Sequence, residues 1–316
     1  MKRIVIALGG NALQEAGKPA TAESQLEVVE KTSEYIADII ESGYDVVLAH
    51  GNGPQVGMIQ NAFAAYHKQQ AKSDIMPLSM CVAMSQGYIG YDLQNMIGEE
   101  LDRRGLGIHC ATVLTQVAVD PADPAFQHPT KPIGAFMTEE EAKKLAAEKG
   151  IDVAEDAGRG WRQVVASPRP KEIVEIATVK ALMNAKHAVI AAGGGGIPVV
   201  WEDKYHLKGV PAVIDKDFAS ECMAEQLDAD MLIILTAVEK VAINFGKPDQ
   251  KNLDELTPEE ARKYMAEGQF APGSMLPKVE AAVKFAESKP GRTALITLLE
   301  KAKDGIEGKT GTAIHL

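Results

Sequence analysis

The sequence predicts an α/β protein of three layers, an open αβα sandwich with helices on both faces of a mainly parallel sheet. Short apolar runs alternate with amphipathic helical stretches along most of the chain, which is the pattern of parallel sheets. Three of the runs end in glycine, in "IALGGN", "LAHGNG" and "IAAGGGG". At 316 residues, the chain is long enough for one large core or for two lobes.

Composition and charge disfavour several classes of protein. The net charge of −11 argues against nucleic acid or an anionic membrane as a partner. No apolar run reaches the roughly 18 residues of a membrane span, and the first run is too short for a secretory signal. Cys81, Cys110 and Cys222 are scattered, so we expect buried free thiols with neither a disulfide framework nor a zinc site. We therefore expect a cytoplasmic protein.

The first third of the chain alternates strands and helices. A strand from Arg3 precedes a helix over Glu23–Ser42, and a second strand follows. Pro54 opens the next helix after a Gly-Asn-Gly turn, where its missing N–H costs nothing. A third helix covers about Cys81–Arg104 and leads into one strand over residues 108–119. The apolar faces predicted for the first two helices are Leu26, Val29, Ile36, Ile39 and Ile40, and Val56, Ile59, Phe63 and Tyr66.

Residues from about 120 to 170 interrupt this alternation. They are rich in turn-forming residues around one charged helix, Glu139–Lys149. Phe126, Phe136 and Trp161 would give the segment a small core of its own, so we predict a protruding subdomain and not a linker.

The alternation then resumes, and the chain divides into two predicted lobes. Residues 1–210, including the subdomain, form the N-terminal lobe, and residues 211–316 form the C-terminal lobe. The elements expected after the insertion are a helix over Glu172–Lys186, a strand before the four glycines, strands over residues 198–203 and 210–215, a helix from Asp217 and a strand over residues 231–238.

The glycine turns indicate a ligand site. In parallel sheets ligands bind beyond the carboxyl ends of the strands, and backbone N–H groups of glycine-rich turns there cradle oxyanions. Neither G-x-G-x-x-G nor G-x-x-x-x-G-K-[ST] is present in the turns. One such turn alone is more often structural, but three together favour ligand binding. His50 lies at a strand end beside Gly51, where a structural hydrogen bond is the expected role.

Three lysines occupy unusual positions. Asp215, Lys216 and Asp217 come directly after an apolar run, so Lys216 is flanked by two carboxylates. Lys278 lies near the start of a helix, where the helix dipole disfavours a cation unless an anion is close. Lys131 lies between two prolines that stiffen its loop. Any one of these lysines taken alone would be read as a solvated surface residue.

Phosphoryl transfer fits this set of groups. The transferred group needs positioning and neutralisation of negative charge more than covalent chemistry, so backbone N–H groups, lysines and Mg²⁺ suffice. No Ser-His-Asp or Cys-His arrangement offers a competing chemistry.

Seven stretches resemble those of the carbamate kinases, a branch of the amino-acid kinase family. They run in consistent order along nearly the whole chain, which ends in "GKTGTAI". The stretches are "IVIALGGNAL", "AHGNGPQVG", "KPIGAF", "AGGGGIPV", "VIDKDFASE", "LIILTAVEKV" and "GQFAPGSMLPKVEAA".

The resemblance implies a role for each matching residue. The N-terminal lobe would bind carbamate or carbamoyl phosphate, and the C-terminal lobe ADP or ATP. Lys131 would close over the substrate, Lys216 and Lys278 would contact nucleotide phosphates, and Asp217 would orient the lysines. The residues implied to hold the phosphoryl and carbamoyl groups are Gly9, Gly10, Asn11, Gly51, Asn52 and Gly53, and those implied to bind nucleotide include Thr236, Ala237, Val238, Gly273, Ser274 and Met275.

The implied reaction converts MgADP and carbamoyl phosphate to MgATP and carbamate, which decays to ammonia and carbon dioxide. Its usual use is in arginine catabolism, and Mg²⁺ is expected through the nucleotide phosphates with no protein-built metal site. A homodimer is also implied, although the apolar helix over Cys81–Arg104 is equally consistent with core packing. The direction of the reaction in the cell does not follow from the residues.

One position separates this chain from other branches of the family. Acetylglutamate kinases resemble it at the Gly-Gly turn but carry a lysine two residues earlier, where this chain has Ala7. Two alternatives stay open: another kinase of this fold that forms an acyl phosphate, and a nucleotide-binding regulator without turnover. The lysines and Asp217 argue against the regulator.

Overall fold

The centre of the molecule is an eight-stranded sheet. The computed structural model describes residues 2–15, 21–70, 75–156, 158 and 160–316. All neighbouring strands run parallel except β16 and β17. In spatial order the strands are β15 (Glu255–Leu256), β17 (Thr312–Ile314), β16 (Thr293–Leu298), β12 (Met231–Thr236), β1 (Arg3–Leu8), β2 (Asp45–His50), β9 (Ala188–Ile190) and β3 (Cys110–Thr112).

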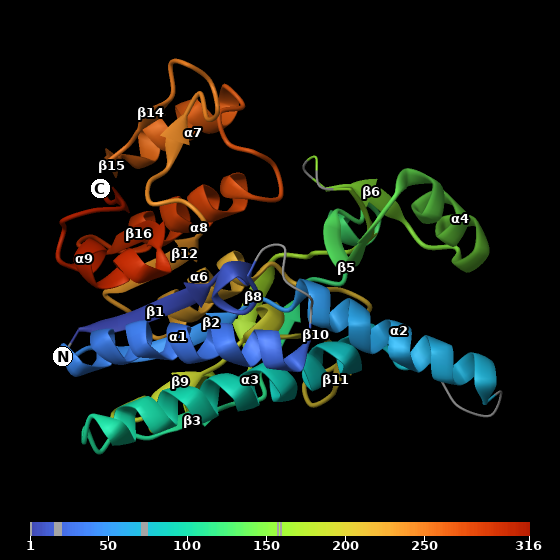
Figure 1. The fold of residues 1–316 in the computed structure, drawn as a ribbon, viewed down its shortest axis with the longest axis horizontal. Coiled ribbons are helices and arrows are strands. Elements are labelled where there is room, and N and C mark those ends of the chain that lie inside the picture. The colour runs from blue at the N-terminus through green and yellow to red at the C-terminus, as the bar shows by residue number, and fades with distance from the viewer. Residues whose placement is uncertain (1, 16–20, 71–74, 157, 159) are drawn as a thin grey trace.

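Helices cover both faces of this sheet, which confirms the predicted three layers (Figure 1). Alternate side chains of β1 enter opposite cores: Ile4 and Ile6 pack with α1, α3 and α9, whereas Val5 and Ala7 pack with α5, α6, α7 and α8. The helices are α1 (Ala22–Glu41), α2 (Gly53–Gln69), α3 (Leu78–Arg103), α5 (Ile176–Asn184), α6 (Lys216–Gln226), α7 (Pro258–Ala266), α8 (Met275–Ser288) and α9 (Ala302–Ile306).

A second sheet of four strands was only partly predicted. The apolar run over residues 108–119 is not one strand, because it passes from β3 in the central sheet to β4 in the second. The expected helix start at Glu172 is also wrong, since this residue lies in β8, and residues 210–215 form no strand. The order of the sheet is β11 (Leu207–Gly209), β10 (Ile197–Trp201), β4 (Gln116–Val119) and β8 (Pro170–Ile173).

The predicted subdomain stands away from the central sheet (Figure 1). It consists of α4 (Glu139–Lys149) and a three-stranded sheet, with residues 157 and 159 of the insertion outside the described part. Thr138 and Glu141 form a capping box at the start of α4. The strands, in spatial order, are β5 (Lys131–Met137), β7 (Trp161–Val165) and β6 (Val153–Glu155).

The separate core expected for the subdomain is absent among its three aromatic residues. Phe126 packs against the main core, Phe136 is exposed and Trp161 is only partly buried. Instead, Ile133 is buried in a cluster with Val56 of α2. A Cβ on Gly57 would lie 2.2 Å from Gly134 Cα, so the subdomain rests on α2 by close backbone approach.

Two predicted apolar faces are only partly buried. Leu26 of α1 and Tyr66 of α2 are exposed. The outer half of α2 projects beyond the body of the molecule (Figure 1), so periodicity identified the helix but not whether a partner covers its face. In α3, the apolar start is mostly core, while Met80 and Tyr91 are exposed.

Short helical turns and a small ribbon complete the described structure. Cys81 and Cys222 are buried free thiols, as the sequence predicts, whereas the free thiol Cys110 is only partly buried. A search of the described helices finds no candidate for a membrane span. The short elements are η1 (Gly10–Ala12), η2 (Pro124–Phe126), η3 (Gly193–Gly195), η4 (Leu299–Lys301), β13 (Ala242–Ile243) and β14 (Lys251–Asn252).

Candidate active site

Three glycine turns meet at one edge of the central sheet. They are residues 9–11 after β1, 51–53 after β2 and 193–196 after β9. β1, β2 and β9 are adjacent and parallel, so their carboxyl ends face the same way. The strand order therefore brings the three turns together at the edge where parallel sheets bind ligands.

Close packing around two of these turns requires glycine. A Cβ on Gly9 would lie 2.7 Å from Leu235 O. At Gly194, where φ is +65°, a Cβ would lie 2.2 Å from Asn52 Nδ2. Asn52 is itself buried and donates a hydrogen bond from Nδ2 to Ser85 Oγ at 2.9 Å. The turns thus fix the side chain of Asn52 as well as their own backbone.

His50 is a buried neutral residue beneath these turns. Its Nδ1 lies 2.9 Å from Gly51 O, which is the structural hydrogen bond expected from the sequence. A Cβ on Gly193 would lie 2.3 Å from His50 Nε2. Burial lowers the pKa of His50 from 6.5 to about 4, although the hydrogen bond to Gly51 opposes the shift, so the imidazole carries no charge at neutral pH.

Asp217 joins two lysines that are far apart in the sequence. Its Oδ1 accepts from Lys216 Nζ at 2.5 Å, and its Oδ2 accepts from Lys278 Nζ at 2.8 Å. The carboxylate is buried, with 3% of its side chain exposed. Burial alone would raise the pKa of Asp217, but the two ammonium groups hold it far below the usual range. Asp217 is therefore a fixed negative charge between two cations.

The two lysines differ in their electrostatic balance. Burial lowers the pKa of Lys216 despite its contact with Asp217. For Lys278, burial also acts downward, but Asp217 outweighs it and the pKa is raised. Lys278 is the fourth residue of α8, as predicted, and Asp217 supplies the nearby anion that offsets the helix dipole.

Lys131 is bound to the start of α6. It is the first residue of β5 and pairs with Val165, so its expected position in a loop is wrong. Its Nζ donates to Asp215 Oδ2 at 2.5 Å, while Asp215 Oδ1 accepts from the backbone N–H of Asp217 at 2.9 Å and caps α6. Burial alone would raise the pKa of Asp215, but the ammonium group of Lys131 lowers it below its usual value.

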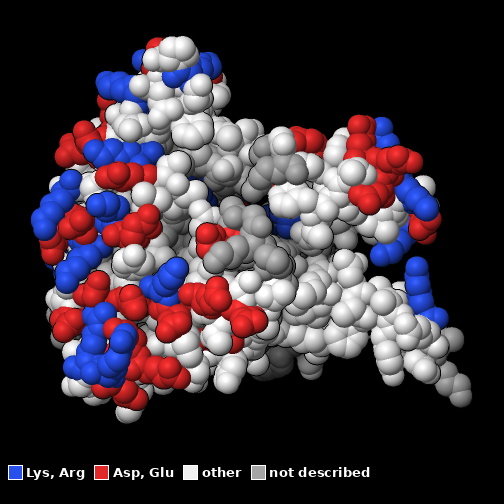
Figure 2. Space-filling view, viewed as in Figure 1, with Lys and Arg blue, Asp and Glu red and all other residues white. Residues whose placement is uncertain are grey.

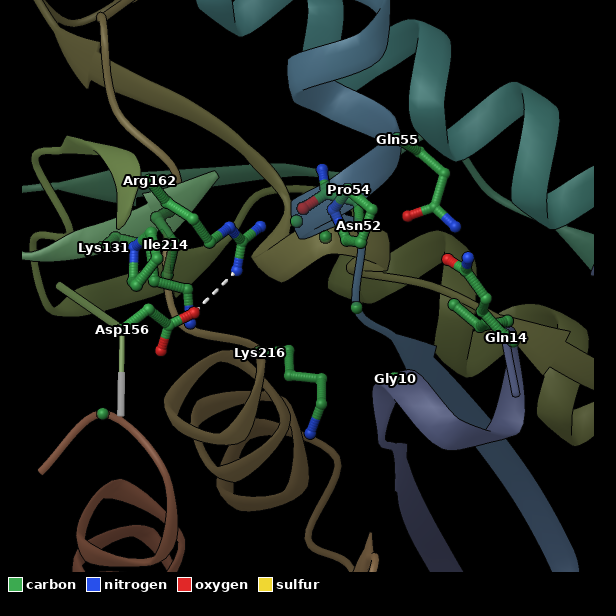
Figure 3. Close-up of a pocket in the computed structure, with 16 residues that line it drawn as sticks. Gly10, Gln14, Asn52, Pro54, Gln55, Lys131, Asp156, Arg162, Ile214 and Lys216 are labelled. Carbon is green, nitrogen blue, oxygen red and sulfur yellow. Dashed lines mark hydrogen bonds and ion pairs between the residues drawn. The ribbon is translucent and has the colours of Figure 1, made fainter. Parts of the chain in front are cut away.

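Lys131, Lys216 and the glycine turns line a pocket with about 750 Å³ of empty space, part of it open to solvent. Figure 2 shows this face of the molecule hollowed between the C-terminal elements and the subdomain. The pocket brings together the subdomain, the three glycine turns and α6 (Figure 3). Its lining residues are Gly10, Leu13, Gln14, Gly51, Asn52, Gly53, Pro54, Gln55, Lys131, Pro132, Asp156, Arg162, Gly194, Ile214, Lys216 and Gly273.

The predicted site residues fall into three groups. Those that line the pocket are Gly10, Gly51, Asn52, Gly53, Lys131, Lys216 and Gly273. Gly9, Asn11, Thr236 and Ala237 line a second hollow of about 620 Å³ at the ends of β1 and β12. Asp217, Val238, Ser274, Met275 and Lys278 line neither of the two, although Asp217 and Lys278 join the pocket through Lys216.

Sequence reasoning missed Arg162 and Asp156 in the pocket wall. Arg162 Nη1 donates to Asp156 Oδ2 at 3.1 Å. Both belong to the turn-rich insertion, where no periodicity or glycine motif marks them, and only the folding of the subdomain over α2 brings them to the pocket. Within the described part of the chain, no group of three or more His, Cys, Asp or Glu residues is arranged to hold a metal ion.

The chain is similar to known proteins over nearly its whole length. A model of the amino acid kinase family matches residues 2–297. A carbamate kinase-like protein of Escherichia coli is 59% identical over 99% of each chain, and a carbamate kinase of Clostridium perfringens is 54% identical over 99% of each chain. A structure of carbamate kinase from Giardia lamblia bound to AMP-PNP superposes with a TM-score of 0.89, at 45% identity over 99% of this chain and 98% of that one.

Proposed function

The chain belongs to the amino acid kinase family, and from this premise we propose that it acts as a carbamate kinase. Its activity is assigned from full-length relatives: the Clostridium perfringens carbamate kinase shares 54% of its residues with this chain. The reaction transfers a phosphoryl group between carbamoyl phosphate and ADP. Formation of ATP leaves carbamate, which decays to ammonia and carbon dioxide.

The chemical step is a direct transfer. An oxygen of the β-phosphate of ADP attacks phosphorus, and the bond between phosphorus and the carbamoyl oxygen breaks, so carbamate leaves with that electron pair. The transition state spreads negative charge over the phosphoryl oxygens. Lys216 and Lys278 would contact the nucleotide phosphates, and N–H groups of the turns at 9–11 and 51–53 would hold the transferred group. No side chain has to form a covalent intermediate.

The observation that carries the mechanism is the bridge through Asp217. One buried carboxylate accepts from Lys216 at 2.5 Å and from Lys278 at 2.8 Å, so both ammonium groups are oriented before substrate binds. Preorganised cations need no reorganisation as charge develops. A regulator that only bound nucleotide would not require this arrangement beside a second, glycine-lined subsite.

The charge that other branches supply from β1 has another source in this chain. Ala7 is fully buried in the central sheet. Lys131 lines the pocket from the subdomain. Its pairing with Asp215, the N-cap residue of α6, holds it near Lys216 and supports its proposed action on carbamoyl phosphate. This placement favours a carbamate kinase over another kinase that forms an acyl phosphate.

Mg²⁺ would enter with the nucleotide and neutralise phosphate charge there. Asp215 and Asp217 are already bound by lysines, so the nucleotide phosphates are the expected ligands. We also propose that residues 1–210 bind the carbamoyl substrate and residues 211–316 the nucleotide, although the two halves share the central sheet and the cores on both of its faces. We propose a cytoplasmic location from the sequence. The use in arginine catabolism and the homodimer are proposed from the resemblance to carbamate kinases.

A coupled assay of ATP formation tests the function. Purified protein with MgADP is offered carbamoyl phosphate, acetyl phosphate and acetylglutamyl phosphate separately. We expect carbamoyl phosphate to give the highest kcat/KM. Faster ATP formation from acetylglutamyl phosphate would reassign the chain to another branch, and no ATP from any of the three would favour the regulator.

A further inference from the structure

Arg162 is held rigidly in the wall of the pocket. Its side chain is 10% exposed, its Nε donates to Gly134 O at 3.0 Å, and its Nη1 donates to Asp156 Oδ2 at 3.1 Å. The guanidinium carbon lies 5.1 Å from the centre of the Phe136 ring. A planar donor fixed by these contacts presents one orientation to a ligand.

Arg162 and Lys216 lie on either side of the Asn52 turn. A Cβ on Gly53 would lie 3.5 Å from Arg162 Nη2, and a Cβ on Gly51 would lie 3.5 Å from Lys216 Cδ. The phosphoryl end of a substrate belongs beside Lys216, which Asp217 ties to Lys278. The acyl end of the same substrate therefore belongs on the side of Gly53, where Arg162 lies.

We propose that Arg162 and Asp156 recognise the carbamoyl group, an inference that rests on the proposed function. Arg162 donates to the carbonyl oxygen and Asp156 accepts from the NH₂ group. Figure 3 shows the two side chains joined in the pocket, a donor beside an acceptor. A carbamoyl group presents the complementary pair in one plane. Acetyl phosphate would place a methyl group against the carboxylate, which a buried polar site rejects.

The test compares two substrates in the same proteins. kcat/KM for ATP formation is measured with carbamoyl phosphate and with acetyl phosphate in the wild type, Asp156→Ala, Asp156→Asn and Arg162→Lys. Glu140→Gln, an exposed carboxylate on α4 of the same subdomain, is the matched control. Circular dichroism and ADP binding check that each variant is folded.

Loss of the acceptor should lower the preference for carbamoyl phosphate. We expect both Asp156 variants to lower kcat/KM for carbamoyl phosphate by about 10- to 100-fold and for acetyl phosphate by much less. Arg162→Lys should lower kcat/KM for both substrates, because both present a carbonyl oxygen. Glu140→Gln should match the wild type.

The outcomes separate this inference from the function itself. If Asp156 only holds Arg162 in place, its replacement lowers kcat/KM for both substrates by the same factor. An unchanged ratio of the two kcat/KM values overturns the proposal. The proposal also fails if the wild type uses carbamoyl phosphate and both Asp156 variants keep its preference for this substrate. A wild type inactive with carbamoyl phosphate would instead overturn the proposed function.

Discussion

Asp217 shows how a single buried residue organises the site. The sequence predicts a helix from Asp217, next to Lys216 and just after an apolar run. The contact of Asp217 with Lys278, 61 residues further on, depends on α6 packing against α8. Arg162 and Asp156 could not be predicted in the same way. No local sequence pattern shows which charged residues of a turn-rich insertion will line the pocket.

Lys131 gives the sharpest residue-level prediction. Lys131→Ala should lower kcat/KM for carbamoyl phosphate roughly 10²- to 10³-fold, comparable to the loss of one preorganised donor to the transition state. ADP binding should hardly change, because Lys131 lies on the subdomain and pairs with Asp215. Steady-state kinetics and calorimetric titration with ADP measure the two effects.

The matched control is Lys143→Ala, which removes an exposed lysine of α4 on the same subdomain. This variant should behave as the wild type. Activity of Lys131→Ala within a few-fold of the wild type, with the circular dichroism spectrum intact, would remove Lys131 from the mechanism.

At the scale of elements, the site depends on where three strands end. The sequence predicts β1, β2 and β9 and the glycines after each. It does not predict that the three strands are neighbours, which follows from the pairing of β2 with both others. It also misses the switch from β3 to β4, because one apolar run serves two sheets when the chain bends at residues 113–115.

The four-glycine turn can be tested with one methyl group. Gly194→Ala places a Cβ 2.2 Å from Asn52 Nδ2, so Asn52 must shift, and we expect kcat/KM to fall roughly 10- to 100-fold. The positive φ of +65° adds a cost of about 1 to 2 kcal/mol in stability. Kinetics and urea unfolding separate these effects.

Gly246→Ala is the matched comparison, because Gly246 has a φ of +75° and no atom within 4 Å of an added Cβ. It should lose similar backbone stability yet keep full activity. Equal loss of activity in both variants would mean that strain, and not the position of Asn52, controls the rate.

Glu221 of α6 pairs with Lys284 of α8, and its protonation makes the free energy of unfolding depend on pH. Lys284 Nζ lies 2.6 Å from Glu221 Oε2. Burial is the main cause that raises the pKa of Glu221 from 4.5 to about 8, and a hydrogen bond with neighbouring Glu225 also raises it. Between these pH values the folded protein holds a proton that the unfolded chain releases, so the contribution of Glu221 to stability falls as pH rises.

Glu221→Gln should remove this dependence. In the wild type we expect the free energy of unfolding to fall by about 2 kcal/mol more between pH 6 and pH 8 than in the variant. Urea unfolding at each pH gives the values, with the exposed Glu267→Gln as control. Parallel pH profiles for wild type and Glu221→Gln would show that Glu221 is ionised throughout this range.

At the scale of the whole molecule, the described part of the chain leaves apolar side chains exposed on two neighbouring helices, α2 and α3. Met58 and Tyr66 on α2, and Met80 and Tyr91 on α3, are exposed, and Figure 2 shows few charged side chains over α2. Patches of this kind mark protein interfaces. We therefore expect a dimer of the 33.8 kDa chain in light scattering at micromolar concentration. A mass of about 34 kDa would contradict it.

The central claim is that the protein transfers the phosphoryl group of carbamoyl phosphate to ADP. ³¹P NMR of a mixture of carbamoyl phosphate, ADP and Mg²⁺ follows every phosphorus atom at once. With the protein present, we predict that the carbamoyl phosphate signal is replaced in equal amount by the γ-phosphate signal of ATP. Conversion to inorganic phosphate with ADP unchanged, beyond the spontaneous rate without protein, or no conversion at all, would contradict the account.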